Sequence, residues 1–163
     1  MESLKFIFLD FDGVITTYNS RWNIDGDKCL LIKKLCDETG AKIVISSSWR
    51  YATLEDTIEK NHLNDWILKD YCYDVTKRFY YSDLEKYWMI PSRGIEIESF
   101  LKSARDKILS DDVPYIIFDD DVYDMLYCQR EHVIKTDWEN GVTEEDIEKA
   151  IEILNQYDRE EDK

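Results

Sequence analysis

The chain has 163 residues, a hydrophobic fraction of 44% and an aromatic fraction of 13%, a composition that excludes a disordered protein. This length is typical of one domain with a substantial core. The formal net charge of −15 argues against broad electrostatic binding to nucleic acid or anionic lipid, so we expect no extended nucleic-acid-binding surface and only local contacts with such a polymer.

The first predicted element is a buried strand that ends in two acidic residues. The apolar run Phe6–Leu9 is bounded by Asp10 and followed by Gly13, as in a central strand of a parallel sheet. Residues two apart in an extended chain share a face, so Asp10 and Asp12 point the same way. Gly13 lets the backbone turn sharply after them. The two carboxylates repel each other, and a divalent cation is the usual compensation.

A polar loop over residues 15–26 precedes the first predicted helix, Asp27–Glu38. Asp25 or Asp27 can cap its N-terminus, and Gly40 suits its C-terminal end. The apolar run Ala41–Ile45 predicts the second strand. A strand, a helix and a strand in this spacing form a βαβ unit with parallel strands.

The next segments are less regular. Thr53–Asp56 is a capping-box pattern that predicts a short helix over Leu54–Lys60. Residues 61–92 are rich in aromatic side chains without a period of 2 or 3.6, which indicates a short strand plus an irregular insertion. The remaining predicted elements are a helix over Ile95–Leu109, a strand over Val113–Phe118, a short strand over His132–Lys135 and a helix over Thr143–Tyr157.

Strands and helices alternate along the chain, which predicts one α/β domain with a doubly wound, mainly parallel sheet over residues 1–157. Residues 158–163 read as an acidic, solvated tail. Ligands of such sheets bind beyond the carboxyl ends of the strands. Three predicted strands end in segments with acidic or hydroxyl side chains, at residues 10–12, 46–48 and 119–121.

The cysteine pattern favours a reducing environment. Four cysteines, without a CxxC pair or a Cys/His cluster, are typical of buried free thiols. No apolar run approaches the length that crosses a membrane, and the first strand begins too near Met1 for a signal peptide. We therefore expect a cytoplasmic protein without a membrane partner; its oligomeric state is left open.

The segment from Phe8 to Val14 also resembles the first motif of the haloacid dehalogenase (HAD) superfamily, because an apolar strand, a DxD pair and Gly-Val occur together. The resemblance implies a HAD Rossmann-like core and a Mg²⁺-dependent phosphatase. Asp10 would be the nucleophile that forms an aspartyl-phosphate, and Asp12 the general acid and base. The alternative for Asp10 and Asp12 is a pair of solvated acids in a turn.

Ser46 follows the second predicted strand, where the second HAD motif has Ser or Thr. Its hydroxyl and the nearby backbone N–H groups can hold phosphate oxygens without adding charge. Ser47 can take the same role, depending on where the strand ends. The alternative is a serine-rich turn that caps the next helix.

The third HAD motif is a Lys or Arg that neutralises the nucleophile and the phosphate. We expect Arg93 in this role, with Lys86 and Lys77 as alternatives, and an ordinary surface position for Arg93 stays open.

The fourth motif is an acidic pair, and Asp119 and Asp120 match it directly after an apolar strand. Mg²⁺ prefers hard oxygen ligands in an octahedron. Asp10, the backbone carbonyl of Asp12 and one of Asp119 and Asp120 would supply the protein ligands, with Asp124 as a further candidate. The alternative is a solvated acidic loop.

Within the superfamily, the chain looks most similar to the HAD domain of Swiss Army knife RNA-repair proteins and to polynucleotide 3′-phosphatases. The similarity lies in residues 8–14, 45–50, 93–97, 117–121 and 141–143. It implies that Gly13, Arg21, Ser47 and Arg50 contact the substrate, although the match at Arg50 is loose in spacing.

The substrate implied by this similarity is a 2′,3′-cyclic or 3′-phosphate end of RNA or DNA. The motif spacing leaves room for a minimal cap or none, so an open site would admit a polymer end. Phe79, Tyr80, Tyr81 and Trp22 or Trp49 are candidates for stacking on a terminal base, or for filling a core. The other hypotheses are a phosphatase of mononucleotides or small phosphate esters, and a non-catalytic HAD-like binding or regulatory domain.

Overall fold

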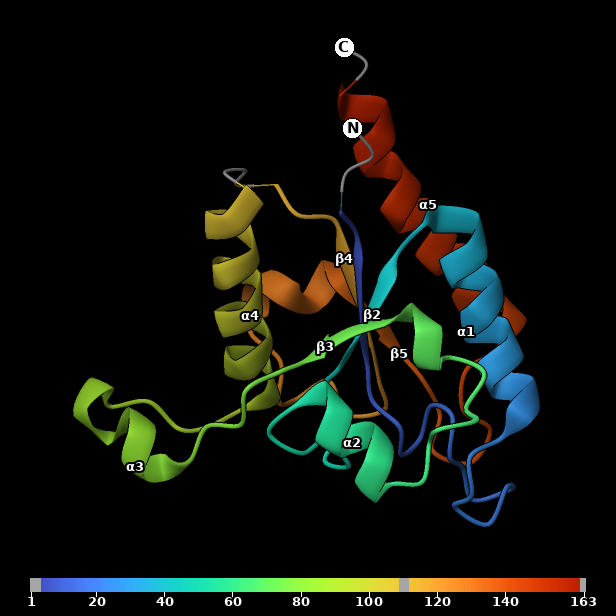
Figure 1. Cartoon of the computed structure of the whole chain (residues 1–163). Coiled ribbons are helices and arrows are strands. Elements are labelled where there is room, and N and C mark those ends of the chain that lie inside the picture. The colour runs from blue at the N-terminus through green and yellow to red at the C-terminus, as the bar shows by residue number, and fades with distance from the viewer. Residues whose placement is uncertain (1–3, 109–111, 162–163) are drawn as a thin grey trace.

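The computed structural model describes residues 4–108 and 112–161 and has five parallel strands in the order β3-β2-β1-β4-β5 (Figure 1). The strands are β1 Phe6–Leu9, β2 Lys42–Ile45, β3 Cys72–Val75, β4 Tyr115–Asp119 and β5 Val133–Lys135. The helices are α1 Gly26–Thr39, α2 Leu54–Lys60, α3 Tyr81–Leu84, α4 Arg93–Ile108 and α5 Glu144–Glu161, with 3₁₀ turns η1 Lys69–Tyr71, η2 Glu85–Tyr87 and η3 Tyr127–His132. This confirms the predicted α/β fold with a parallel sheet.

The predicted caps explain where the first helices begin and end. The Asp25 carboxylate accepts a hydrogen bond from the Asp27 amide at the start of α1, at 2.9 Å. Gly40 ends α1 with a φ of 69°, a left-handed conformation that suits glycine. Thr53 caps α2 by accepting from the Asp56 amide at 3.1 Å.

The two faces of the sheet pack against different helices, because alternate residues of each strand point to opposite sides. Ile7 and Leu9 lie in a core with the apolar residues of α1 and α5, whereas Phe6 and Phe8 lie in a second core with those of α4. Figure 1 shows α1 and α5 on one side of the sheet and α4 on the other. The central strands β1 and β4 are buried along their whole length, which agrees with their apolar sequences, whereas the edge strands β3 and β5 are partly exposed.

The segment expected to be a short strand plus an irregular insertion contains β3, which pairs with β2 at one edge of the sheet. The following short helix α3 and turn η2 project away from the body (Figure 1). This projection has an exposed aromatic surface, with Trp88 97% exposed. These exposed side chains explain why residues 61–92 carry no clear period.

Several predicted helix ends differ from the structure. Helix α1 is one residue longer at each end, α4 begins at Arg93 rather than Ile95, and α5 begins at Glu144 rather than Thr143.

The helix expected to stop at Leu109 is described as far as Ile108, and Leu109 lies outside the described residues. Helix α5 continues to Glu161, so most of the predicted tail over 158–163 is helical; residues 162–163 lie outside the described part. Glutamate and arginine are good helix formers, and no Gly or Pro follows Tyr157 to end the helix.

The cysteines are all free, as predicted, but they are not all buried. Cys29 and Cys36 are buried, Cys72 is half-buried, and Cys128 is exposed. No helix among residues 4–108 and 112–161 combines the length and the apolar character needed to cross a membrane.

Candidate active site

The register of the sheet brings the ends of three strands to one level. Leu9 in β1 lies opposite Ile45 in β2 and Phe118 in β4. The next residue of each strand therefore lies at the same edge of the sheet. The Asp10 amide donates to the Phe118 carbonyl at 3.1 Å, and the Ser46 amide donates to the Leu9 carbonyl at 3.1 Å.

Arg93, the first residue of α4, lies between two of the buried acids. Its Nη1 is 2.9 Å from Asp10 Oδ2 and 2.7 Å from Asp119 Oδ2. The start of α4 is held beside the site by Asp124, whose carboxylate accepts from the Arg93 amide at 2.9 Å and whose carbonyl accepts from the Gly94 amide at 2.9 Å. Arg93 therefore neutralises part of the charge that the strand ends bring together.

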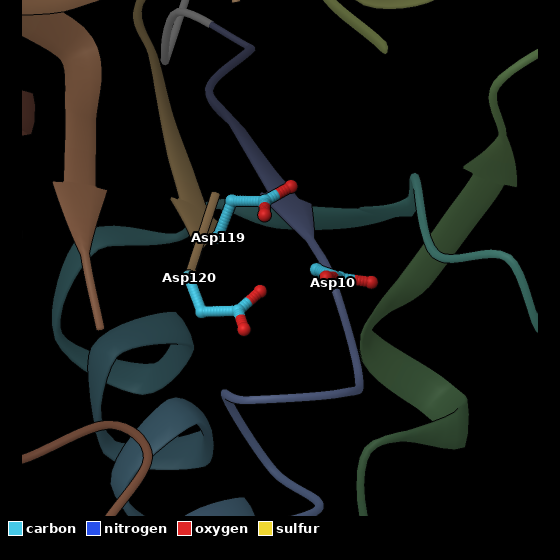
Figure 2. A group of neighbouring side chains, drawn as sticks. All are labelled: Asp10, Asp119 and Asp120. Atoms are coloured by element: carbon cyan, nitrogen blue, oxygen red, sulfur yellow. The ribbon is translucent and has the colours of Figure 1, made fainter. Parts of the chain in front are cut away.

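Asp10, Asp119 and Asp120 form an acidic cluster in which one oxygen of each carboxylate lies within 4.8 Å of the others. Figure 2 shows Asp119 and Asp120 projecting from the end of β4 toward the segment that carries Asp10. Gly13 makes room for this arrangement. A Cβ at Gly13 would lie 2.5 Å from Asp120 Cγ, and its φ of 79° is itself a glycine conformation.

Burial perturbs the two acids that contact Arg93. It raises the pKa of Asp10, against the lowering effects of the Arg93 charge and of hydrogen bonds from Arg93, the Phe11 amide and Ser47. Burial also raises the pKa of Asp119 to about 7; the positive charge of Arg93 opposes this shift and the negative charge of Asp10 adds to it. Arg93 therefore offsets only part of the cost of burying these carboxylates.

Asp12 is oriented by two side-chain donors. Trp49 Nε1 lies 3.2 Å from Asp12 Oδ1 and 3.1 Å from Oδ2, and Thr16 Oγ1 donates to Oδ1 at 2.8 Å. These contacts hold its carboxylate apart from the three-acid cluster, so only its backbone carbonyl stays a predicted metal ligand. A carboxylate held in one orientation two residues from Asp10 suits proton transfer to or from a reacting oxygen.

The two serines after β2 face different surroundings. Ser46 is fully buried, and its Oγ has no hydrogen-bond partner among the described residues. The Ser47 hydroxyl hydrogen-bonds to Asp10 and accepts from the Trp49 amide at 3.2 Å. A buried hydroxyl without a partner is costly unless another group pairs with it, which fits an oxygen-rich ligand at this point.

Arg50 differs from its predicted role in substrate binding, because its guanidinium is buried and committed to the protein. It pairs with Glu96 of α4 and donates to the carbonyls of Ser46, Ser47 and Thr76 at 3.0, 2.8 and 2.9 Å. Glu96 also accepts from the Phe79 amide at 3.1 Å. Arg50 thus joins the ends of β2 and β3 to α4 rather than meeting a ligand.

Four other candidates lie apart from the acidic cluster. Arg21 is exposed on the loop after β1, with a φ of 53°. Lys86 and Lys77, the alternatives to Arg93, lie over the rings of Tyr87 and Phe79. Asp124 caps α4 as described above. The Gly13 amide donates to the Thr16 carbonyl at 2.7 Å, so its predicted contact with substrate cannot use that N–H group.

Sequence reasoning missed three supporting residues. Trp49 was predicted as a stacking residue and not as a donor to Asp12. Glu96 was part of the similar segment 93–97 but had no predicted role, and Thr136 had none either. Thr136 Oγ1 donates to the Gly13 carbonyl at 2.6 Å and so ties the end of β5 to the turn after β1. Only Trp49 had a sequence signal, its position directly after the serine run; the contacts of Glu96 and Thr136 join distant segments.

Comparison with known proteins gives one match. A family model described as the HAD domain in Swiss Army Knife RNA repair proteins matches residues 6–147. No curated protein and no solved structure gives a significant match. The matched range covers β1 to the first turn of α5 and contains every residue of the acidic cluster together with Arg93.

Proposed function

Because the chain belongs to the family of HAD domains of Swiss Army Knife RNA repair proteins, we propose that it is a Mg²⁺-dependent phosphohydrolase that removes a terminal phosphate from a nucleic acid or a nucleotide through an aspartyl-phosphate on Asp10. The observation that carries the proposal is the position of Arg93 between Asp10 and Asp119, beside Asp120. Three carboxylates and one guanidinium at the edge of a parallel sheet form a site for a cation and a phosphate.

The donor set fits Mg²⁺. The cluster offers only hard carboxylate oxygens, and its three negative charges exceed the single charge of Arg93 by the charge of one divalent cation. Asp10, Asp119 or Asp120, and the backbone carbonyl of Asp12 would hold the ion. When bound, Mg²⁺ would withdraw charge from the phosphoryl oxygens and relieve the repulsion between the acids.

The chain's own residues supply the proposed steps. An oxygen of Asp10 attacks phosphorus and the bond to the leaving oxygen breaks, while Arg93 stabilises the charge on the phosphoryl group. Asp12 donates its proton to the leaving oxygen. It then takes a proton from the water that attacks the aspartyl-phosphate, which restores Asp10 and releases phosphate.

The surrounding contacts support these roles. Trp49 and Thr16 hold the Asp12 carboxylate in one orientation, which reduces the reorganisation needed for proton transfer. The unpartnered Ser46 hydroxyl would pair with a phosphoryl oxygen.

The test is phosphate release with Mg²⁺ from a 3′-phosphorylated oligonucleotide, from 3′- and 5′-mononucleotides, and from p-nitrophenyl phosphate. We expect release by the natural chain and none by Asp10→Asn. Asp121→Asn is the matched control, because Asp121 follows the cluster in the same loop, is exposed, and should leave turnover unchanged. Release by Asp10→Asn at the natural rate would refute the nucleophile, and no release from any substrate would favour the non-catalytic hypothesis.

A further inference from the structure

A groove of 860 Å³ opens beside the candidate site, between the loop after β2 and the loop after β3. We call it the strand groove. It is lined by residues 48–52 and 74–78, together with Asn61 and Tyr80. Its size lies within the range of about 300–1,000 Å³ typical of pockets that hold a small organic ligand.

Trp49 connects the strand groove to the candidate site. Trp49 is one of the residues that line the groove, and its Nε1 donates to both carboxylate oxygens of Asp12. In the proposed reaction Asp12 protonates the oxygen that leaves with the rest of the substrate. Trp49 therefore belongs both to the wall of the strand groove and to the contacts of the carboxylate that would protonate the leaving oxygen.

The groove has a locally positive surface in a chain of net charge −15. Lys77 and Arg78 are both exposed there, against one acidic lining residue, Asp74. The fourth charged residue, Arg50, is buried and paired with Glu96. Arg78 is fixed at the rim, because its Nη2 donates to the Ser48 carbonyl at 3.0 Å. Local positive charge of this kind attracts an anionic backbone.

Three aromatic side chains line the same groove: Trp49, Tyr51 and Tyr80. Tyr51 is 45% and Tyr80 64% exposed, so neither ring is buried in the core. Lys60 Nζ lies over the Tyr51 ring, 4.8 Å from its centre, which leaves Tyr80 as the better stacking residue. Exposed rings next to cations are the usual means of binding single strands, since unpaired bases stack on aromatic side chains while cations contact the phosphates. A base within a duplex cannot stack in this way.

We propose that the strand groove binds the nucleotides next to the terminal phosphate of a single-stranded polynucleotide. Tyr80 stacks on a base, and Lys77 and Arg78 contact the first backbone phosphate beyond the scissile one. This inference rests on the proposed function and extends it, because it assigns a polymer rather than a mononucleotide as the substrate.

Two variants test the groove without touching the acidic cluster, Tyr80→Ala and Lys77→Gln. Their matched controls are Tyr127→Ala, an 82% exposed tyrosine of η3, and Lys102→Gln, an exposed lysine of α4. Each is assayed for kcat/KM on a 3′-phosphorylated single-stranded oligonucleotide and on p-nitrophenyl phosphate, which has no base and no second phosphate.

We expect Tyr80→Ala to lower kcat/KM on the oligonucleotide roughly tenfold, the loss of one stacked base, with no change on p-nitrophenyl phosphate. Lys77→Gln should reduce the slope of log(kcat/KM) against log[salt] on the oligonucleotide by about 0.7, as for one lost phosphate contact on a single strand. Neither control should change either value.

Equal losses on both substrates, or unchanged kinetics on the oligonucleotide, would overturn the groove assignment while leaving the phosphatase intact. A separate binding measurement keeps the two proposals apart. Fluorescence anisotropy with a labelled oligonucleotide and Asp10→Asn protein should show weaker binding when Tyr80→Ala is added. If Tyr80→Ala weakens oligonucleotide binding but the natural chain releases phosphate from no substrate, the proposed function is refuted and the groove assignment stands. If Tyr80→Ala leaves binding unchanged, the groove assignment is refuted.

Discussion

The buried ion pair between Arg50 and Glu96 leads to a prediction that is independent of catalysis. The pair lies at the centre of a junction, because Arg50 contacts the ends of β2 and β3 while Glu96 belongs to α4 and accepts from the Phe79 amide. The Arg50 and Glu96 side chains are only 4% and 9% exposed. Glu96→Gln removes the negative charge and leaves the shape of the side chain almost unchanged.

The expected loss follows from burial. Burial lowers the pKa of Arg50, and the charge of Glu96 opposes that shift, so without Glu96 a buried guanidinium has no charged partner. Removing one partner of a buried pair costs about 3–5 kcal/mol. We expect the lower end, about 3 kcal/mol, because a glutamine oxygen still accepts a hydrogen bond. This is a large fraction of a typical free energy of unfolding of about 5–15 kcal/mol.

The assay is urea unfolding followed by circular dichroism. With an m-value of about 2 kcal/mol/M, Glu96→Gln should lower the midpoint by about 1.5 M. The matched control is Glu98→Gln on the same helix, which breaks the half-exposed pair of Glu98 and Arg105 at 2.7 Å. That pair should contribute at most about 1 kcal/mol. Equal shifts in the two variants would refute the argument from burial.

Three further results are expected at the site. Gly13→Ala should destabilise the fold by about 1–3 kcal/mol and weaken Mg²⁺ binding, both measurable by calorimetry, because its Cβ would strike the Asp120 carboxyl group in a left-handed backbone. Because burial raises the pKa of Asp119 to about 7, protons compete with the metal for this carboxylate below that pH. The Mg²⁺-induced rise in Tm should therefore be larger at pH 8 than at pH 6, and equal rises would contradict this. Trp49→Phe should lower kcat about tenfold, with Tm little changed, because Asp12 loses one of its orienting donors; an unchanged kcat would argue against that role.

Strands and helices were predictable where an apolar run or a capping residue in the local sequence determines them. The apolar run Phe6–Leu9 is a strand because it is buried on both faces, and the helix Leu54–Lys60 has the predicted bounds because Thr53 caps it. The projecting part of residues 61–92 was not predictable in detail. Its aromatic side chains lie outside the core, so their spacing follows neither the period of a strand nor that of a helix.

The three acids of the cluster were predictable as neighbours, because the carboxyl ends of parallel strands meet at one edge of the sheet. The burial of Arg50 and its ion pair with Glu96 were not predictable. Its partner Glu96 lies 46 residues away, and no local pattern distinguishes a buried arginine from one that meets a ligand. Trp49 similarly reaches Asp12 across 37 residues, a contact that only the folded β1 and β2 create.

The projection formed by α3 and η2 is attached to the body at both ends by contacts that do not involve its own tip. Phe79 is held by Glu96 before it, and the Arg93 amide is held by Asp124 after it. Doubling the length of the chain between such anchors costs only about 0.6 kcal/mol in loop closure. In evolution this segment can therefore lengthen or change sequence while Arg93 keeps its position beside Asp10 and Asp119.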